Sequence, residues 1–215
     1  MHVAASANVE EPFGLVTLVN STIRHCSMPA GLHFHLVAPL ELRHRLRLVL
    51  ESLFPAASFR MYTLDIGGAR SKIVRHLHRG EREPVLLSPY RYALPYLPLL
   101  LPTHIRRVLW VHADTLIFGN VASLLIDTSL DGAPAAASED CTCLAAVRFN
   151  DSHPALRGAV PAGACSLHLS LVLVDLLQWS LLDMAARVEY WQSLNLRSVR
   201  CVRKVDVGHV RRAGR

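Results

Sequence analysis

Apolar and polar positions alternate between strand-like and helix-like spacing over the first 64 residues. Short apolar or alternating runs predict strands at 2–6, 32–37 and 59–64. Between them, apolar residues recur every three or four positions, which predicts one helix around 15–23 and a second over 42–54. This strand–helix–strand–helix–strand order is typical of a doubly wound sheet with right-handed crossovers.

The rest of the chain continues the same pattern. Apolar runs predict strands at 107–111, 133–137 and 170–175, and helical spacing predicts the helices at 92–101, 120–125, around 179 and at 187–194. The stretch 67–89 is polar and basic, and we interpret it as an excursion near the functional site. We therefore expect an α/β domain, a doubly wound and mainly parallel sheet, over residues 1–195.

Two predictions concern the C-terminal part of the chain. Trp179 and Trp191 lie on predicted helices, so we expect both to pack in the core against the sheet. Residues 196–215 form a basic tail with little apolar periodicity. We expect this tail to be poorly ordered, because such a composition buries little apolar area.

Composition narrows the classes of function. Hydrophobic residues make up 51% of the chain and charged residues 19%, which argues against global disorder. The net charge of +6 admits acidic partners. Outside the tail, however, the arginines of the chain are scattered, and no helix-turn-helix or aromatic-rich pattern accompanies them. We therefore do not expect nucleic acid as a partner. No apolar run is long enough to predict a membrane span, and no basic leader precedes the first strand.

Cysteine and histidine patterns do not predict a zinc site. The five cysteines are odd in number, and Cys141 and Cys143 are too close together for a zinc knuckle without a second pair. We therefore interpret the cysteines as buried thiols, with one disulfide among them if the protein is secretory. The twelve histidines show no H-x-x-x-H spacing.

The stretch 107–125 carries the most informative chemistry. A buried strand ends at His112, Ala113 and Asp114, and ligands of open α/β sheets bind at such strand ends. An apolar run, a glycine and an amphipathic helix follow. This order resembles the V-L-Y-L-D-x-D-x-x-x-x-G-D-I-x-x-L signature of family 8 glycosyltransferases. In that family the two aspartates chelate Mn²⁺, which holds the diphosphate of a UDP-sugar.

The resemblance assigns site residues along the chain. His112 and Asp114 take the two metal-ligand positions, with an imidazole in place of the first carboxylate. Ala113, between them, takes a donor-binding position. The opening strand resembles the family's nucleotide-contacting strand, which implies donor contacts from Ala5, Ser6 and Asn8. Further matches follow in the family's order at 20–26, 34–38, 53–59, 137–141, 165–179 and 188–195.

Several positions depart from the family pattern. Leu94 replaces the arginine that steadies the diphosphate, and Arg91, one helical turn earlier, is the candidate to compensate. His168 replaces an asparagine of the donor pocket. The family's H-x-x-G-x-x-K-P-W element, which supplies a third metal ligand and a phosphate-binding lysine, is absent from this sequence. We therefore expect a GT-A-type nucleotide-sugar-binding fold whose C-terminal part is incomplete.

The resemblance implies a function and an alternative. The function is transfer of a hexosyl or hexuronosyl group from a UDP-sugar to a glycan acceptor, with retention of the anomeric configuration. The resemblance also implies that the reaction requires Mn²⁺ and takes place in the Golgi lumen. The branch it resembles is galacturonosyltransferase-like, which points to pectin and cell-wall synthesis. The alternative is a catalytically inactive relative, or a truncated product, acting as a binding or scaffold protein. Because the leaving phosphate can accept the acceptor's proton, we assign no catalytic residue.

Overall fold

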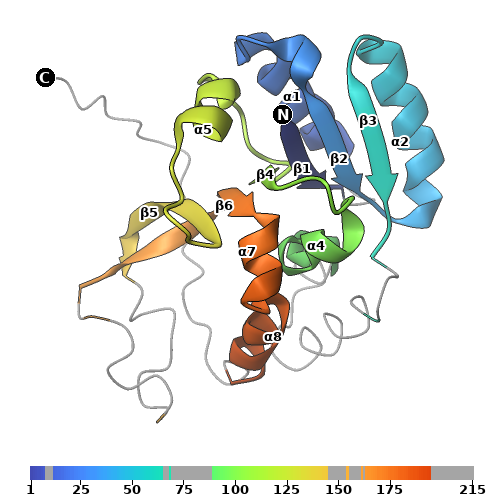
Figure 1. Cartoon of the computed structure of the whole chain (residues 1–215). Helices are drawn as coiled ribbons and strands as arrows, with labels where there is room; N and C mark the ends of the chain where they lie inside the picture. Colours follow the sequence, from blue (N-terminus) through green and yellow to red (C-terminus); the bar gives the residue numbers. More distant parts are fainter. Residues whose placement is uncertain are drawn as a thin grey trace, which may run out of the picture.

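The structure, a computed structural model, describes residues 1–7, 12–64, 68, 89–144, 154, 161 and 163–194. A six-stranded sheet in the order β3–β2–β1–β4–β6–β5 forms its centre (Figure 1). The first four of these strands are parallel to one another, and β6 is antiparallel to both of its neighbours, β4 and β5. The strands are β1 (His2–Ser6), β2 (His33–Val37), β3 (Ser58–Tyr62), β4 (Arg107–Val111), β5 (Ala135–Leu144) and β6 (Cys165–Asp175).

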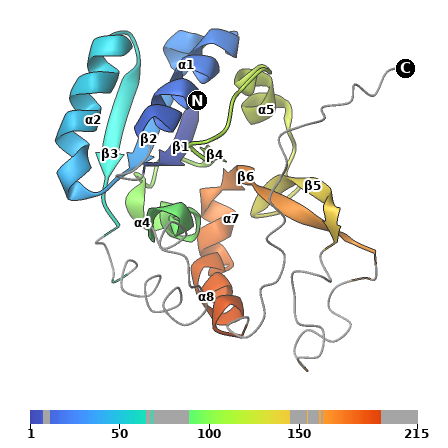
Figure 2. The same ribbon diagram turned by 180° about the vertical axis from the view of Figure 1, so that it is seen from behind.

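Helices cover both faces of the sheet, as Figures 1 and 2 show from opposite sides. One face packs against α1 (Pro12–His25), α2 (Leu40–Leu53) and α5 (Val121–Asp127), and η1 (Pro29–Gly31) precedes β2. The other face packs against η4 (Leu94–Tyr96), α4 (Leu97–Leu100), α7 (Leu176–Leu181) and α8 (Met184–Leu194), with η3 (Pro89–Tyr92) leading in. The predicted open, mainly parallel α/β fold is confirmed.

The central strands are buried on both faces. Val3 and Ala5 of β1 belong to the apolar cluster under α1, whereas Ala4 belongs to the cluster under α4 and α7. In β4, Leu109 belongs to the cluster under α1 and Trp110 to the cluster under α4 and α7. Because both faces are covered, these strands read as continuous apolar runs, which is why the sequence predicted them well.

The segment predicted as one helix at 92–101 consists of short pieces instead. It contains the 3₁₀ turns η3 and η4 and the single turn α4. Pro95 and Pro98 each lie in the first turn of one piece, where the missing backbone N–H costs nothing. In the middle of a continuous helix, each proline would have broken the hydrogen-bond ladder.

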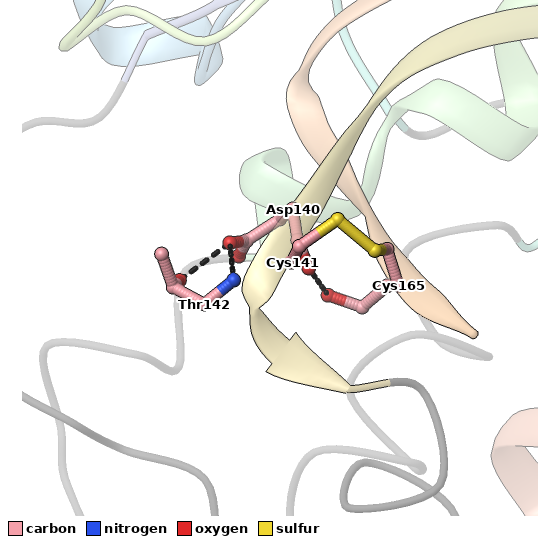
Figure 3. Close-up of a disulfide and its surroundings, with 5 residues drawn as sticks. Asp140, Cys141, Thr142 and Cys165 are labelled. Atoms are coloured by element: carbon pink, nitrogen blue, oxygen red, sulfur yellow. Dashed lines mark hydrogen bonds between the residues drawn. A yellow bond between two sulfur atoms is a disulfide. The ribbon is translucent and has the colours of Figure 1, made fainter. Parts of the chain in front are cut away.

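The two antiparallel strands are longer than predicted and are cross-linked. Beyond the pairing of Ala137 with Val172, the ladder resumes at Ser138 and His168 after an irregularity. A disulfide joins Cys141 of β5 to Cys165 of β6, with Cα atoms 4.4 Å apart (Figure 3). This covalent bond fixes the outer end of the ladder, where few apolar contacts are available.

The two tryptophans differ from each other. Trp179 is 6% exposed, and its indole Nε1 donates to the Pro95 carbonyl at 3.1 Å, so its predicted core position is confirmed. The prediction for Trp191 is wrong, since this side chain is 38% exposed. The reason is that α8 packs mainly against α7 and η4, at the end of α7 away from the sheet (Figure 1). Trp191 lies in the last turns of that helix.

The expected excursion at 67–89 and the basic tail at 196–215 lie almost wholly outside the described residues. Within the described residues, no helix combines the length and apolarity that crossing a bilayer requires.

Candidate functional site

The sheet reverses its strand order between β1 and β4. The chain adds β2 and β3 on one side of β1, then crosses over to place β4 on the other side. Open α/β sheets bind ligands at the carboxyl ends of the strands that flank such a switch point. His112 and Asp114 directly follow β4, so the structure confirms their predicted position at a strand's C-terminal end.

A tight turn holds the two side chains together. The His112 backbone N–H donates to the Ser170 carbonyl of β6 at 2.8 Å, and Thr115 N–H donates back to the His112 carbonyl at 3.0 Å. The His112 Nδ1 and Asp114 Oδ1 atoms are 2.6 Å apart. The His112 side chain is 20% exposed and that of Asp114 62% exposed. The pair is therefore accessible at the sheet edge, with the imidazole oriented by the carboxylate.

The first turn of α1 presses against this site. An added Cβ at Gly14 would lie 2.9 Å from the Ala113 carbonyl oxygen, closer than real Cβ atoms come. Glycine is therefore required here for the helix to approach the turn, a need that no local sequence pattern indicates. The approach brings the helix N-terminus, where free N–H groups and the helix dipole favour anions, beside the His112–Asp114 pair.

The loop after the site is fastened to the same helix. The Ile117 N–H donates to the Ser21 hydroxyl at 3.2 Å. Asn120 caps α5 by accepting from the Ala122 N–H at 3.1 Å, and its amide donates to the Ser27 hydroxyl at 3.0 Å. These bonds hold the loop from 115 to 120 in one position relative to α1.

Some of the other residues predicted to contact the sugar donor lie near the His112–Asp114 pair, and others lie outside the described residues. Ala5 and Ser6 are buried at the end of β1. Ala4 pairs with Trp110 of β4, and two residues further along the same parallel register Ser6 is level with His112. Asn8 lies outside the described residues, and only the backbone of Arg91 is described, in η3.

His168 lies on β6, two residues before the carbonyl that bonds to His112. Its side chain is exposed, and its backbone pairs with Ser138. Since β6 runs antiparallel to β4, this part of β6 extends past the carboxyl end of β4. His168 is thus carried to the correct edge of the sheet, and its exposed neighbour Leu169 adds apolar bulk there.

A second group of metal-type ligands does not form a metal site. Glu139, Cys141 and Cys165 lie close together at the outer end of β5 and β6. Both sulfurs are committed to the disulfide, so neither is a thiolate that could bind a cation. Nearby, Asp140 accepts a bond from the Thr142 N–H at 3.1 Å, within the same part of β5 (Figure 3).

A buried histidine chain was not predicted from the sequence. His35 of β2 is 2% exposed. Its Nε2 lies 3.0 Å from His2 Nδ1, and its Nδ1 lies 2.9 Å from the Tyr62 hydroxyl. Burial, the largest cause, and nearby positive charges lower the pKa of His35 to about 3 and that of His2 to about 4. Both imidazoles are therefore neutral at pH 7. The sequence did not predict their contact, because it shows only alternating polar positions on three separate strands.

An open α/β sheet with a polar cluster at its switch point is the arrangement in which α/β proteins commonly bind ligands. The chain belongs to glycosyl transferase family 8, whose family model matches residues 2–204. Among relatives in Arabidopsis thaliana, "Probable galacturonosyltransferase-like 3" is 27% identical over 200 residues, and "Probable galacturonosyltransferase-like 6" is 27% identical over 204 residues. Each alignment covers 92% of this chain and 56% of the relative, so the chain spans about half the length of these proteins.

Solved structures share the fold. A galactosyltransferase, LgtC, determined with donor and acceptor sugar analogues, superposes with a TM-score of 0.64 at 16% identity, covering 90% of this chain and 66% of that one. Mouse xyloside xylosyltransferase 1 gives a TM-score of 0.64 at 15% identity, covering 90% and 73%. The architecture is thus that of GT-A glycosyltransferases.

Proposed function

We propose that this chain binds a UDP-sugar at the carboxyl ends of β1 and β4 and transfers the sugar, hexosyl or hexuronosyl, to a glycan acceptor with retention. The observation that carries the proposal is the accessible His112–Asp114 pair at the switch point of a family 8 fold. The adjacent N-terminus of α1 suits the negative diphosphate of such a donor.

His112 and Asp114 fit a divalent cation in ligand type. Imidazole and carboxylate both bind Mn²⁺-like ions. Because His112 Nδ1 and Asp114 Oδ1 point toward each other at 2.6 Å, a cation bound by both side chains would take the place of their hydrogen bond. A cation held there would neutralise charge on the leaving diphosphate. A neutral nitrogen in place of a charged oxygen weakens the attraction for a hard cation, so we propose loose binding.

The chain's own residues then act by positioning. The α1 N-terminus and the turn at 112–115 hold the diphosphate, while the bond from the Ile117 N–H to the Ser21 hydroxyl ties the following loop to α1. Leu94 is buried in the apolar cluster under the sheet, so it adds no charge near the diphosphate in place of the family's arginine. Loss of one such stabilising group lowers rates by about 10²–10³. We therefore propose slow turnover. The alternative, an inactive relative that only binds its ligand, rests on the same replacement of the family's arginine by Leu94.

The experiment is calorimetry with UDP, with and without Mn²⁺. We expect weak binding that requires Mn²⁺. Asp114→Ala should abolish it and His112→Asp should strengthen it, because the second change restores a charged oxygen ligand. Asp127→Ala, an exposed carboxylate on α5, is the matched control and should leave binding unchanged. Silent results at both His112 and Asp114 would place the donor site elsewhere.

We also propose a secretory-pathway location, in the Golgi lumen. The supporting observation is the Cys141–Cys165 disulfide, because such bonds persist in oxidising compartments and are rare in the cytosol. Mass spectrometry after alkylation of the native protein should find this pair oxidised and linked; free thiols at both positions would contradict the location.

A further inference from the structure

Helix α1 contains a sequence pattern that the donor site does not use. Residues 20–22 read Asn-Ser-Thr, which is the N-x-S/T acceptor pattern for asparagine-linked glycans, and the middle residue is not proline. We call these three residues the acceptor triplet. The chain has one other such pattern, at 150–152, which lies outside the described residues.

Asn20 lies on the solvent side of α1. Phe13, Thr17 and Arg24 are exposed and share this side at helical spacing, whereas Leu18 faces the core. The Asn20 side chain is partly exposed in the middle of this stripe. A bulky hydrophilic group attached to its amide nitrogen would therefore extend into solvent without displacing a core side chain.

The other two residues of the acceptor triplet are closed off in the folded chain. Thr22 is 0% exposed, and its hydroxyl donates to the Leu18 carbonyl at 2.7 Å. Ser21 is 7% exposed, and its hydroxyl donates to the same carbonyl at 3.0 Å. A glycan-transferring enzyme has to reach the hydroxyl of the third residue and bend the triplet around the asparagine. Any modification of Asn20 therefore has to precede the formation of α1.

Helix α1 has little stability of its own. It has 14 residues, a length at which isolated helices are marginal in water. Helix formation is further disfavoured by Gly14 and by five β-branched residues, Val16, Thr17, Val19, Thr22 and Ile23. Its apolar side packs in a cluster that includes Leu109 and Val111 of β4 and Val121 of α5. Until those partners are present, the acceptor triplet stays in an unfolded and accessible chain.

We propose that Asn20 carries an asparagine-linked oligosaccharide that is added while α1 is still unfolded. The proposal rests on the proposed secretory-pathway location, because the donor is a lipid-linked oligosaccharyl pyrophosphate of that pathway. Asn20 Nδ2 forms a bond to the anomeric carbon of the first sugar as the bond from that carbon to the pyrophosphate oxygen breaks. The lipid pyrophosphate leaves with the electron pair of the broken bond, and the amide proton passes to a base of the transferring enzyme.

The experiment is translation of the full chain behind a cleavable signal sequence in the presence of endoplasmic-reticulum microsomes. We expect peptide mapping to find a glycan on Asn20 that a peptide N-glycosidase removes. Asn20→Gln and Thr22→Val should each remove this one glycan, and Thr22→Ser should keep it, because serine also supplies the hydroxyl. Asn120→Gln, outside any acceptor pattern, is the matched control and should leave it in place. Because modification precedes folding, the stability of these variants does not affect the result.

A second measurement tests the order of events. The purified and folded chain, made without a glycan, is incubated with the transferring enzyme and its lipid-linked donor. We expect it to stay unmodified, whereas Leu18→Pro, which breaks α1 and leaves the acceptor triplet intact, should become an acceptor. Equal modification of the folded chain would show that α1 does not protect the triplet.

An unmodified Asn20 in chains whose signal sequence has been cleaved would overturn the proposed site. That result would leave the proposed location untouched, because the added signal sequence supplies the compartment and the Cys141–Cys165 pairing tests the location separately. A glycan found only at position 150 would likewise show that the compartment is right and that Asn20 is not the acceptor. UDP binding by the unglycosylated chain, measured in parallel, tests the proposed function independently of the glycan.

Discussion

Lowering the pH from 7.5 to 5.0 should destabilise the fold through the buried histidine chain. His35 and His2 have pKa values lowered to about 3 and about 4, against 6.5 in the unfolded chain. Below pH 6.5 the unfolded state therefore takes up protons that the folded state refuses. Stability is complete above this pH and is lost as the pH falls toward the folded-state values.

The magnitude follows from the pH interval. Each histidine costs about 1.4 kcal/mol for every pH unit below 6.5, which gives about 2 kcal/mol for His35 at pH 5.0. His2 is only partly buried, so water screens part of its effect, and we expect about 1–2 kcal/mol from it. Met1, His33, Arg60 and His104 oppose protonation as well, because all carry or can acquire positive charge.

The assay is urea unfolding of the wild type and of His35→Gln at several pH values between 7.5 and 5.0. Glutamine does not titrate and can still bond to Tyr62, so the variant separates titration from packing. We expect the variant to be less stable at pH 7.5 but to lose about 1.4 kcal/mol less per pH unit below 6.5. Parallel pH dependences in the two proteins, or a His35 imidazole resonance titrating near pH 6.5, would refute the reasoning.

Three further outcomes follow from the structure. Replacing Cys141 and Cys165 by serine should cost about 3–4 kcal/mol in chemical unfolding, because the disulfide closes a 24-residue loop, and an unchanged midpoint would contradict this. Gly14→Ala should lower stability by about 1–3 kcal/mol and weaken UDP binding, although alanine favours helices, because its Cβ meets the Ala113 carbonyl; Gly119→Ala, in open space, should be neutral. Trp179→Ala should cost about 3–5 kcal/mol and Trp191→Ala clearly less, as thermal unfolding would show, and the reverse order would be inconsistent with their burial.

The sequence predicted the parts of this fold that are buried on two faces. Strands β1 and β4 were found because covered strands are continuously apolar, and His112 and Asp114 were placed because they follow such a strand. The outer part of β6 was missed because Leu167 and Leu169 are exposed there, so no buried stripe marks it. The contact of Gly14 with Ala113 and the chain from His2 to Tyr62 were beyond prediction, since each joins segments that only tertiary packing brings together.

The order of strands also bears on how the chain folds during synthesis. β1 emerges from the ribosome before the other described strands, but its neighbour β4 begins only after a further 100 residues, at positions 7–106. At 5–20 residues per second, this leaves one edge of an apolar strand without its partner for roughly 5–20 s. An unpaired apolar edge of this kind is a template for aggregation. The same crossover that brings Ser6 and His112 together therefore leaves β1 open to wrong pairing until β4 has been made.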